Sequence, residues 1–260
     1  MPVRKGTPAL LSAGTLCAAL LLTGCGSPAA PPTPAPTPTT APAAETGPRP
    51  GSPGKAIASA PVPETRLPGI GPVTHASVPD DTSQALVVTG ASADSTRSTA
   101  TLYSRDPVGG WKRQAGPWPT HNALRGWTAD HTAGDLRTPI GVFRLGDAGG
   151  RLPDPGTLLP YDQDEQFAIS GTGFAGEPLE GSFDHVVAID YNRVPGRSPL
   201  DKERPLGAEK GGGVWIHVDH AGPTQACVTL EREELRELLR ALDPAREPVV
   251  VMGPTTELAR

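Results

Sequence analysis

The sequence predicts a mainly β domain with one well-marked helix near its C-terminal end, preceded by a long segment that has no core of its own. Short runs rich in β-branched residues, bounded by Gly, Pro and Asp, recur from about residue 85 onward and are typical of strands. Leucines at helical spacing stand out in a single place, shortly before the end of the chain. Between residues 26 and 66, Pro, Ala, Thr, Gly and Ser dominate.

The predicted strands are short apolar segments between turn-forming residues. They are Ala85–Thr89, Thr99–Ser104, Gly141–Leu145, Phe167–Ser170, Val186–Tyr191, Val214–Val218 and Val249–Met252.

The predicted helix follows Thr229. Acidic residues at its start favour the positive end of the helix dipole, and Asp243-Pro244 predicts where it stops. Its buried face is marked by four leucines, Leu235, Leu238, Leu239 and Leu242.

The N-terminus has the order of a secretion signal, with Arg4 and Lys5 ahead of an apolar run from Ala9 to Leu22. This run is shorter than the roughly 20 apolar residues that a membrane-spanning helix needs. The tetrapeptide Leu22-Thr23-Gly24-Cys25 resembles the bacterial lipobox. The resemblance implies that residues 1–24 are a lipoprotein signal peptide and that a lipid on Cys25 holds the mature chain on the outer face of the cytoplasmic membrane. The alternative is an ordinary cleaved signal and a fully secreted product.

Residues 25–70 are expected to form a disordered linker, because so little apolar surface cannot offset the entropy of ordering. Residues 71–260 are long enough for one folded domain, although the sequence leaves open whether residues 71–113 form a separate small module. The formal net charge is −5 and no cluster of Lys or Arg is present. A nucleic-acid partner is therefore not expected.

Cysteine usage draws attention to Cys227. Cys17 leaves with the predicted signal and Cys25 is acylated, so the mature chain keeps one thiol and no disulfide partner. Cys227 lies ten residues after His217, a histidine at the end of a predicted strand. An ion pair with imidazolium would favour the reactive thiolate, because a free thiol has a pKa of about 8.5. From the residue types alone, a buried inert cysteine and a core histidine are the commoner explanation.

Several motifs together resemble the L,D-transpeptidase catalytic domain, the YkuD-type fold of bacterial cell-wall enzymes. The segment 135–143 is similar to that family's Thr-Pro-x-Gly-x-Phe strand, and 183–192 resembles its central strand ending in Tyr-Asn. The segment 213–218 resembles the strand that bears the histidine. Thr224-Gln225-Ala226-Cys227-Val228-Thr229-Leu230 resembles the short-loop Thr-x-Gly-Cys-Val-x-Leu nucleophile motif, and the ending 241–253 fits the same pattern.

The resemblance implies a β-sandwich-like L,D-transpeptidase fold and a reaction without metal or cofactor. Cys227 is then the nucleophile, His217 the general base and later acid, and the backbone amides of Ala226 and Cys227 the donors to the oxyanion. The substrates implied are peptidoglycan stem peptides, cut at an L,D-configured bond and joined to a second amine or to water. Ala226 departs from the family's glycine. If this position needs a positive φ, alanine would strain the backbone and slow the enzyme.

Two other functions stay open. A non-catalytic wall-binding module on the same fold is one, and metal binding by His217, Asp219, His220 and Cys227 is the other. Alternation along the predicted strand favours His217 as the base and places His220 in an exposed loop. The histidines outside the recognised motifs, His75, His121 and His131, are expected to be ordinary surface or core residues.

Overall fold

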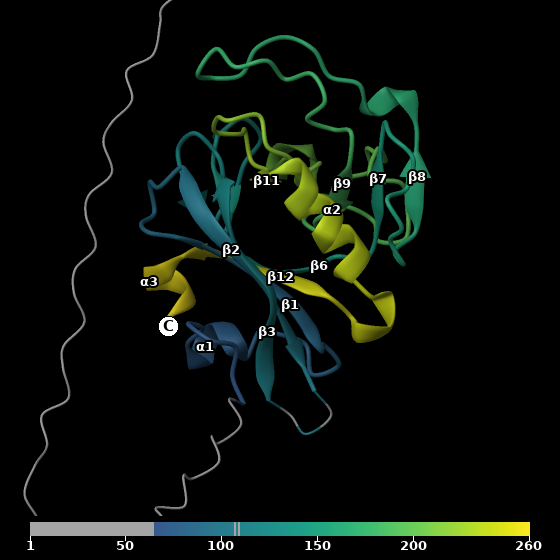
Figure 1. The fold of residues 1–260 in the computed structure, drawn as a ribbon. Coiled ribbons are helices and arrows are strands. Elements are labelled where there is room, and N and C mark those ends of the chain that lie inside the picture. Colours follow the sequence, from purple (N-terminus) through teal and green to yellow (C-terminus); the bar gives the residue numbers. More distant parts are fainter. Residues whose placement is uncertain (1–64, 107, 109) are drawn as a thin grey trace, which may run out of the picture. The chain divides into compact units, whose positions relative to one another are not determined.

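The computed structural model describes residues 65–260 except 107 and 109, and these residues form a mainly β domain with two mixed five-stranded sheets and few short helices (Figure 1). The strands are β1 (Gln84–Gly90), β2 (Arg97–Arg105), β3 (Trp111–His121), β4 (Trp127–Thr128), β5 (Thr138–Pro139), β6 (Gly141–Arg144), β7 (Ala148–Gly150), β8 (Tyr161–Gln163), β9 (Val186–Ala188), β10 (Trp215–Val218), β11 (Val228–Leu230) and β12 (Val249–Pro254). The helices are α1 (Pro72–His75), α2 (Arg232–Ala241) and α3 (Thr255–Leu258), with 3₁₀ turns at Glu165–Phe167, Ala208–Lys210 and Pro244–Arg246.

The first sheet has the order β3-β2-β1-β12-β6, with β1 and β12 parallel at its centre. Both of its faces are buried. Leu86 and Val88 belong to the main core, whereas Ala85 and Val87 belong to a second cluster on the opposite face. Burial of both faces explains why these strands read as continuous apolar runs.

The second sheet has the order β11-β10-β9-β7-β8 and carries the residues of interest. Helix α2 packs against it: the leucines predicted for the buried face are fully buried, in one cluster with apolar residues of both sheets. The helix ends at Ala241, just before the predicted stop at Asp243-Pro244. The predicted helix is therefore confirmed, and it joins the two sheets into one core.

Most predicted strands are confirmed, but two differ. Residues 167–170 form no strand: Phe167 ends a 3₁₀ turn and its ring packs against Trp215, with centroids 5.7 Å apart. Strand β9 stops at Ala188 instead of continuing to Tyr191. The sequence patterns also missed β3, β4, β5, β7, β8 and β11.

The segment 71–113 is not a separate module, because β1, β2 and β3 share one sheet with β12 and β6. The packed chain also includes residues before Gly71. Leu67 and Ile70 are buried against the outer face of the first sheet.

A buried ionic cluster shapes the chain beyond β9. The Arg193 guanidinium donates to Asp147 at 2.8 Å and also pairs with Asp190, and all three side chains are almost fully buried. Burial outweighs the arginine's effect on Asp190 and raises the pKa of that carboxyl. Removing one member of such a cluster would leave charge uncompensated in the interior. The cluster therefore fixes where the chain turns away from the sheet.

Candidate active site

An open cavity of about 510 Å³ collects four segments of the chain around β10. They come from residues 131–134, 169–183, 199–204 and 211–227. Both predicted catalytic residues, Cys227 and His217, line it, as does Ala226. Much of the remaining wall is apolar, which is usual for a site that excludes water from a ligand.

Strand pairing brings Cys227 to the site. Strands β10 and β11 are parallel with Ile216 opposite Val228, so Cys227 lies beside Trp215. The thiol sulfur accepts the Trp215 backbone N–H at 3.4 Å and lies 3.7 Å from the Gly213 carbonyl oxygen. His217 lies two positions beyond Trp215 and therefore on the same face of β10.

His217 is held in one orientation. Its side chain is buried, and the Phe183 ring meets it edge-on at 5.1 Å. Imidazole Nδ1 lies 3.0 Å from the Val218 carbonyl oxygen, so in the neutral ring this nitrogen carries the proton and donates it. The lone pair is then on Nε2, the form that a general base requires.

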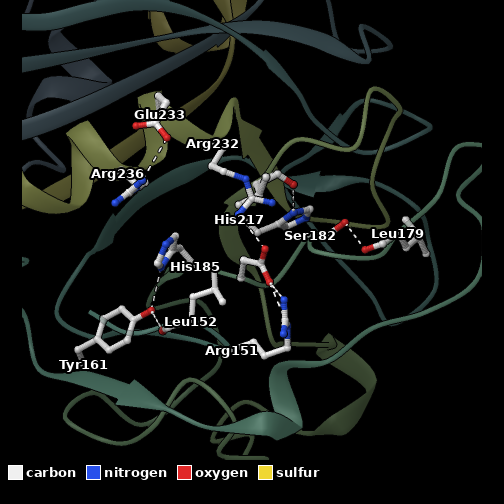
Figure 2. Close-up of polar contacts among 12 residues, drawn as sticks. Arg151, Leu152, Tyr161, Leu179, Ser182, His185, His217, Arg232, Glu233 and Arg236 are labelled. Atoms are coloured by element: carbon white, nitrogen blue, oxygen red, sulfur yellow. Dashed lines mark hydrogen bonds and ion pairs between the residues drawn. The ribbon is translucent and has the colours of Figure 1, made fainter. Parts of the chain in front are cut away.

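The segment that carries Phe183 is fixed on both sides. Ser182 Oγ donates to the Leu179 carbonyl oxygen at 2.6 Å, and Arg151 and Arg232 both donate to the Asp184 carboxylate at 2.7 Å (Figure 2). The Ser182 carbonyl oxygen also accepts the backbone N–H of Val218 at 3.0 Å. Phe183 is thereby kept against the imidazole.

The surroundings oppose charge on both groups. Burial raises the pKa of the Cys227 thiol to about 11, against a smaller lowering by the Trp215 N–H. Burial likewise lowers the pKa of His217 to about 4, with a smaller opposing effect from the Val218 carbonyl. The thiolate–imidazolium pair expected from the sequence is therefore not favoured at rest, and the pair is neutral near pH 7.

Ala226 is not strained. Its φ is not among the positive values of the described residues, and its side chain packs against the main core. The premise that this position requires glycine is therefore wrong for this chain. Within residues 65–260, neither the Ala226 nor the Cys227 amide donates to a protein acceptor, so both stay available to a ligand.

Thr224 fixes the loop before the thiol. Its hydroxyl donates to the Cys227 carbonyl oxygen at 2.6 Å. Its backbone pairs with the chain beyond β3, receiving from Leu124 at 2.9 Å and donating to Asn122 at 3.0 Å. Thr224 thus holds its loop to Cys227 on one side and to the chain after β3 on the other.

His220 does not occupy the exposed position predicted for it. Its side chain is only 5% exposed, its ring stacks on His217 with centroids 5.6 Å apart, and its Nδ1 lies 3.1 Å from Glu177 Oε1. The carboxylate fits because Gly173 and Gly222 lack side chains: a Cβ on either would fall within 2.1 Å of Glu177 Oε1. The loop that carries Glu177 is therefore joined to the histidine strand.

Of the histidines outside the motifs, His131 lines the cavity and His121 does not. His121 Nδ1 lies 2.9 Å from Asp219 Oδ1, which also accepts the Thr229 hydroxyl. Burial of Asp219 opposes ionisation, but these hydrogen bonds hold its pKa below the ordinary value. His131 is buried and lines the cavity. In the described part of the chain, no group of three or more His, Cys, Asp and Glu side chains could hold a metal ion.

Tyr191 and Asn192, which end the predicted central strand, hold the loop that leads to the glycines of the cavity wall. Asn192 has a φ of 46° and its side-chain amide donates to the carbonyl oxygens of Gly207 and Gly211, at 2.9 and 2.6 Å. The Tyr191 hydroxyl donates to the Lys210 carbonyl oxygen at 2.9 Å. These bonds hold the loop that returns to β10.

The pH dependence of thiol reactivity tests the neutral pair. Alkylation of Cys227 by iodoacetamide should rise roughly tenfold per pH unit from pH 7 to 10, because the thiolate fraction grows in that proportion below its pKa. Stopped-flow mixing followed by mass mapping of the Cys227 peptide measures it. A rate that is already level between pH 5 and 8 would mean that the ion pair exists at rest.

Glycine at position 226 should bring no gain. Carbapenems acylate the family that the motifs resemble. If they acylate Cys227, Ala226→Gly should leave the acylation rate unchanged and lower the free energy of unfolding by about 0.4–1 kcal/mol, since the unfolded chain gains freedom. Ala221→Gly is the matched control, because Ala221 has a φ of 65° and glycine there should stabilise. Acylation kinetics and urea unfolding decide, and a clear acceleration in Ala226→Gly would restore the strain argument.

Cys25, the expected signal peptide and most of the expected linker lie outside the described residues. Among residues 65–260, no helix has the length and apolar character to cross a membrane.

Comparisons with protein-family models, with curated proteins and with solved structures find no match to this chain.

Proposed function

We propose that this chain is a cysteine acyltransferase of the L,D-transpeptidase kind, acting at L,D bonds of peptidoglycan stem peptides. The observation that carries the proposal is that the Cys227 thiol and the His217 imidazole line a single cavity. The imidazole presents Nε2 as its free nitrogen, and two unpaired backbone amides adjoin the thiol. The mainly β architecture is compatible with the β-sandwich-like L,D-transpeptidase fold that the motifs resemble.

The neutral resting pair defines the first step of the mechanism. As Sγ of Cys227 attacks the carbonyl carbon of the scissile bond, Nε2 of His217 takes the thiol proton, so the thiolate never accumulates. The negative charge that develops on the carbonyl oxygen is stabilised by the Ala226 and Cys227 amides.

Collapse of the tetrahedral intermediate completes acylation. The C–N bond breaks, the imidazolium returns its proton to the leaving amine of the D-residue, and a thioester remains on Cys227. An acceptor amine then loses a proton to His217 and attacks the thioester, which restores the thiol and forms the new peptide bond. Water in place of the amine gives an L,D-carboxypeptidase instead.

One observation favours a second function. A thiol whose pKa is raised by burial is a poor nucleophile unless its base removes the proton during attack. A catalytically weak peptidoglycan-binding module on the same fold is the alternative, and it predicts stem-peptide binding without acylation of Cys227.

The turnover of a tetrapeptide stem tests the catalytic roles. Cys227→Ala should abolish product formation and also the covalent adduct with carbapenems. His217→Ala should slow acylation by about two to four orders of magnitude, since both proton transfers lose their carrier. Mass spectrometry of products and of the intact protein measures both effects. Binding of the stem without any acylation of the native protein would favour the binding module, and full acylation of Cys227→Ala would refute the nucleophile.

The proposed location is the outer face of the cytoplasmic membrane, with the linker carrying the domain away from a lipid on Cys25. The lipobox-like tetrapeptide supports it. A labelled fatty acid should enter the native chain in bacterial cells and should not enter Cys25→Ala, because the sulfur is the attachment atom. Gel autoradiography measures this, and equal labelling of both chains would contradict the anchor.

A further inference from the structure

Two cationic side chains line the same cavity as Cys227. They are Lys202 and Arg204, from the loop that Asn192 helps to hold. The chain as a whole carries a net charge of −5. A pair of cations on the wall of an otherwise largely apolar cavity is therefore a local exception that calls for an anionic ligand.

The Arg204 guanidinium lies along the glycines that lead into β10. A Cβ on Gly212 would lie 2.3 Å from Arg204 Nε, and one on Gly213 would lie 3.6 Å from Nη2. Gly211, Gly212 and Gly213 all have positive φ, of 67°, 143° and 68°, so the close approach depends on glycine. The Gly213 carbonyl oxygen is the atom 3.7 Å from the Cys227 sulfur. One residue thus separates the thiol from the guanidinium.

No carboxylate of the described residues pairs with either cation. Nη1 of Arg204 donates to the carbonyl oxygens of Asp201 and Glu203, at 3.0 and 2.8 Å, and these acceptors are neutral. The carboxylates of Asp201 and Glu203 pair with Arg197 instead. In the described part of the chain, Nε and Nη2 of Arg204 donate to no protein group. These two nitrogens form the edge that binds a carboxylate with two parallel hydrogen bonds.

We infer that Lys202 and Arg204 form a subsite for the free carboxylate of the donor substrate, beside the bond that Cys227 attacks. The inference rests on the proposed function. In a tetrapeptide stem the terminal D-residue carries its carboxylate three bonds from the scissile carbonyl carbon, so an anion of this class must sit close to the thiol. The subsite selects donors that end one residue after the scissile bond. Cleavage of that bond then releases the D-residue as a free amino acid.

A pair of alkylating reagents tests the subsite without turnover. Sγ of Cys227 displaces iodide from the methylene carbon of iodoacetate or of iodoacetamide and forms a thioether in both cases. Because the same thiol reacts, the ratio of the two rates does not depend on the thiol's pKa. Removing each cation should lower the iodoacetate-to-iodoacetamide ratio by up to about five-fold, the equivalent of about 1 kcal/mol for a solvent-accessible charge pair.

The variants are Lys202→Gln, Arg204→Gln and the double variant, all in the full chain. The control is Arg113→Gln, because Arg113 is an exposed residue of β3 that does not line the cavity. Mass mapping of the Cys227 peptide gives each rate. The expected result is a lower ratio in the three variants and an unchanged ratio in Arg113→Gln. The same ratio in all proteins would overturn the subsite, and so would a thiol that neither reagent reaches.

Stem peptides separate this inference from the proposed function. With a tetrapeptide stem, Arg204→Gln should raise KM more than it lowers kcat, and replacing the terminal carboxylate by an amide should remove the difference between the variant and the native protein. If no stem turns over, the proposed function fails, while the alkylation ratio still decides the subsite.

Discussion

The parallel pairing of β10 with β11 is the contact on which the candidate site depends. It places Cys227 beside Trp215 and leaves His217 on the same face, although ten residues separate the thiol from the imidazole in the chain. Thr224 then fixes the loop before the thiol, and the Phe183 ring covers the histidine. A shift of one residue in this register would turn the imidazole to the opposite face of the sheet.

Those parts of the fold that rest on local patterns could be predicted from the sequence. The central strands of the first sheet are buried on both faces, and the leucine-marked helix has one apolar side, so each has a composition that identifies it. Residues 148–150 gave no such signal. A Cβ on Gly149 would lie 2.6 Å from the Asp162 carbonyl oxygen and 2.8 Å from the Phe167 ring, so glycine in β7 reflects crowding by distant segments. The strand predicted to begin at Phe167 was wrong for a related reason. A buried aromatic ring in a 3₁₀ turn gives the same sequence pattern as the start of a strand.

Elimination singled out Cys227 as the thiol to explain, and alternation along the strand favoured His217 over His220. Their roles as nucleophile and base were implied only by the motif resemblance and stay a prediction. The charge states of the two groups could not be predicted, because the desolvation that shifts both pKa values comes from packing of segments far apart in the sequence. The burial of His220 depends on Glu177, 43 residues earlier in the chain. The backbone conformation of Ala226 was judged from the family's glycine, and the structure gives this position an ordinary φ.

The central place of β12 has a consequence for how the domain comes into being. Residues 249–254 lie between β1 and β6, hydrogen-bonded to both, although they follow both strands far along the chain. Until these residues pair, β6 has no strand that joins it to β1. The first sheet therefore cannot close before residues 249–254 are free to pair with both strands. Because this pairing joins segments far apart in the chain, closure of the first sheet is expected to be a slow step of folding.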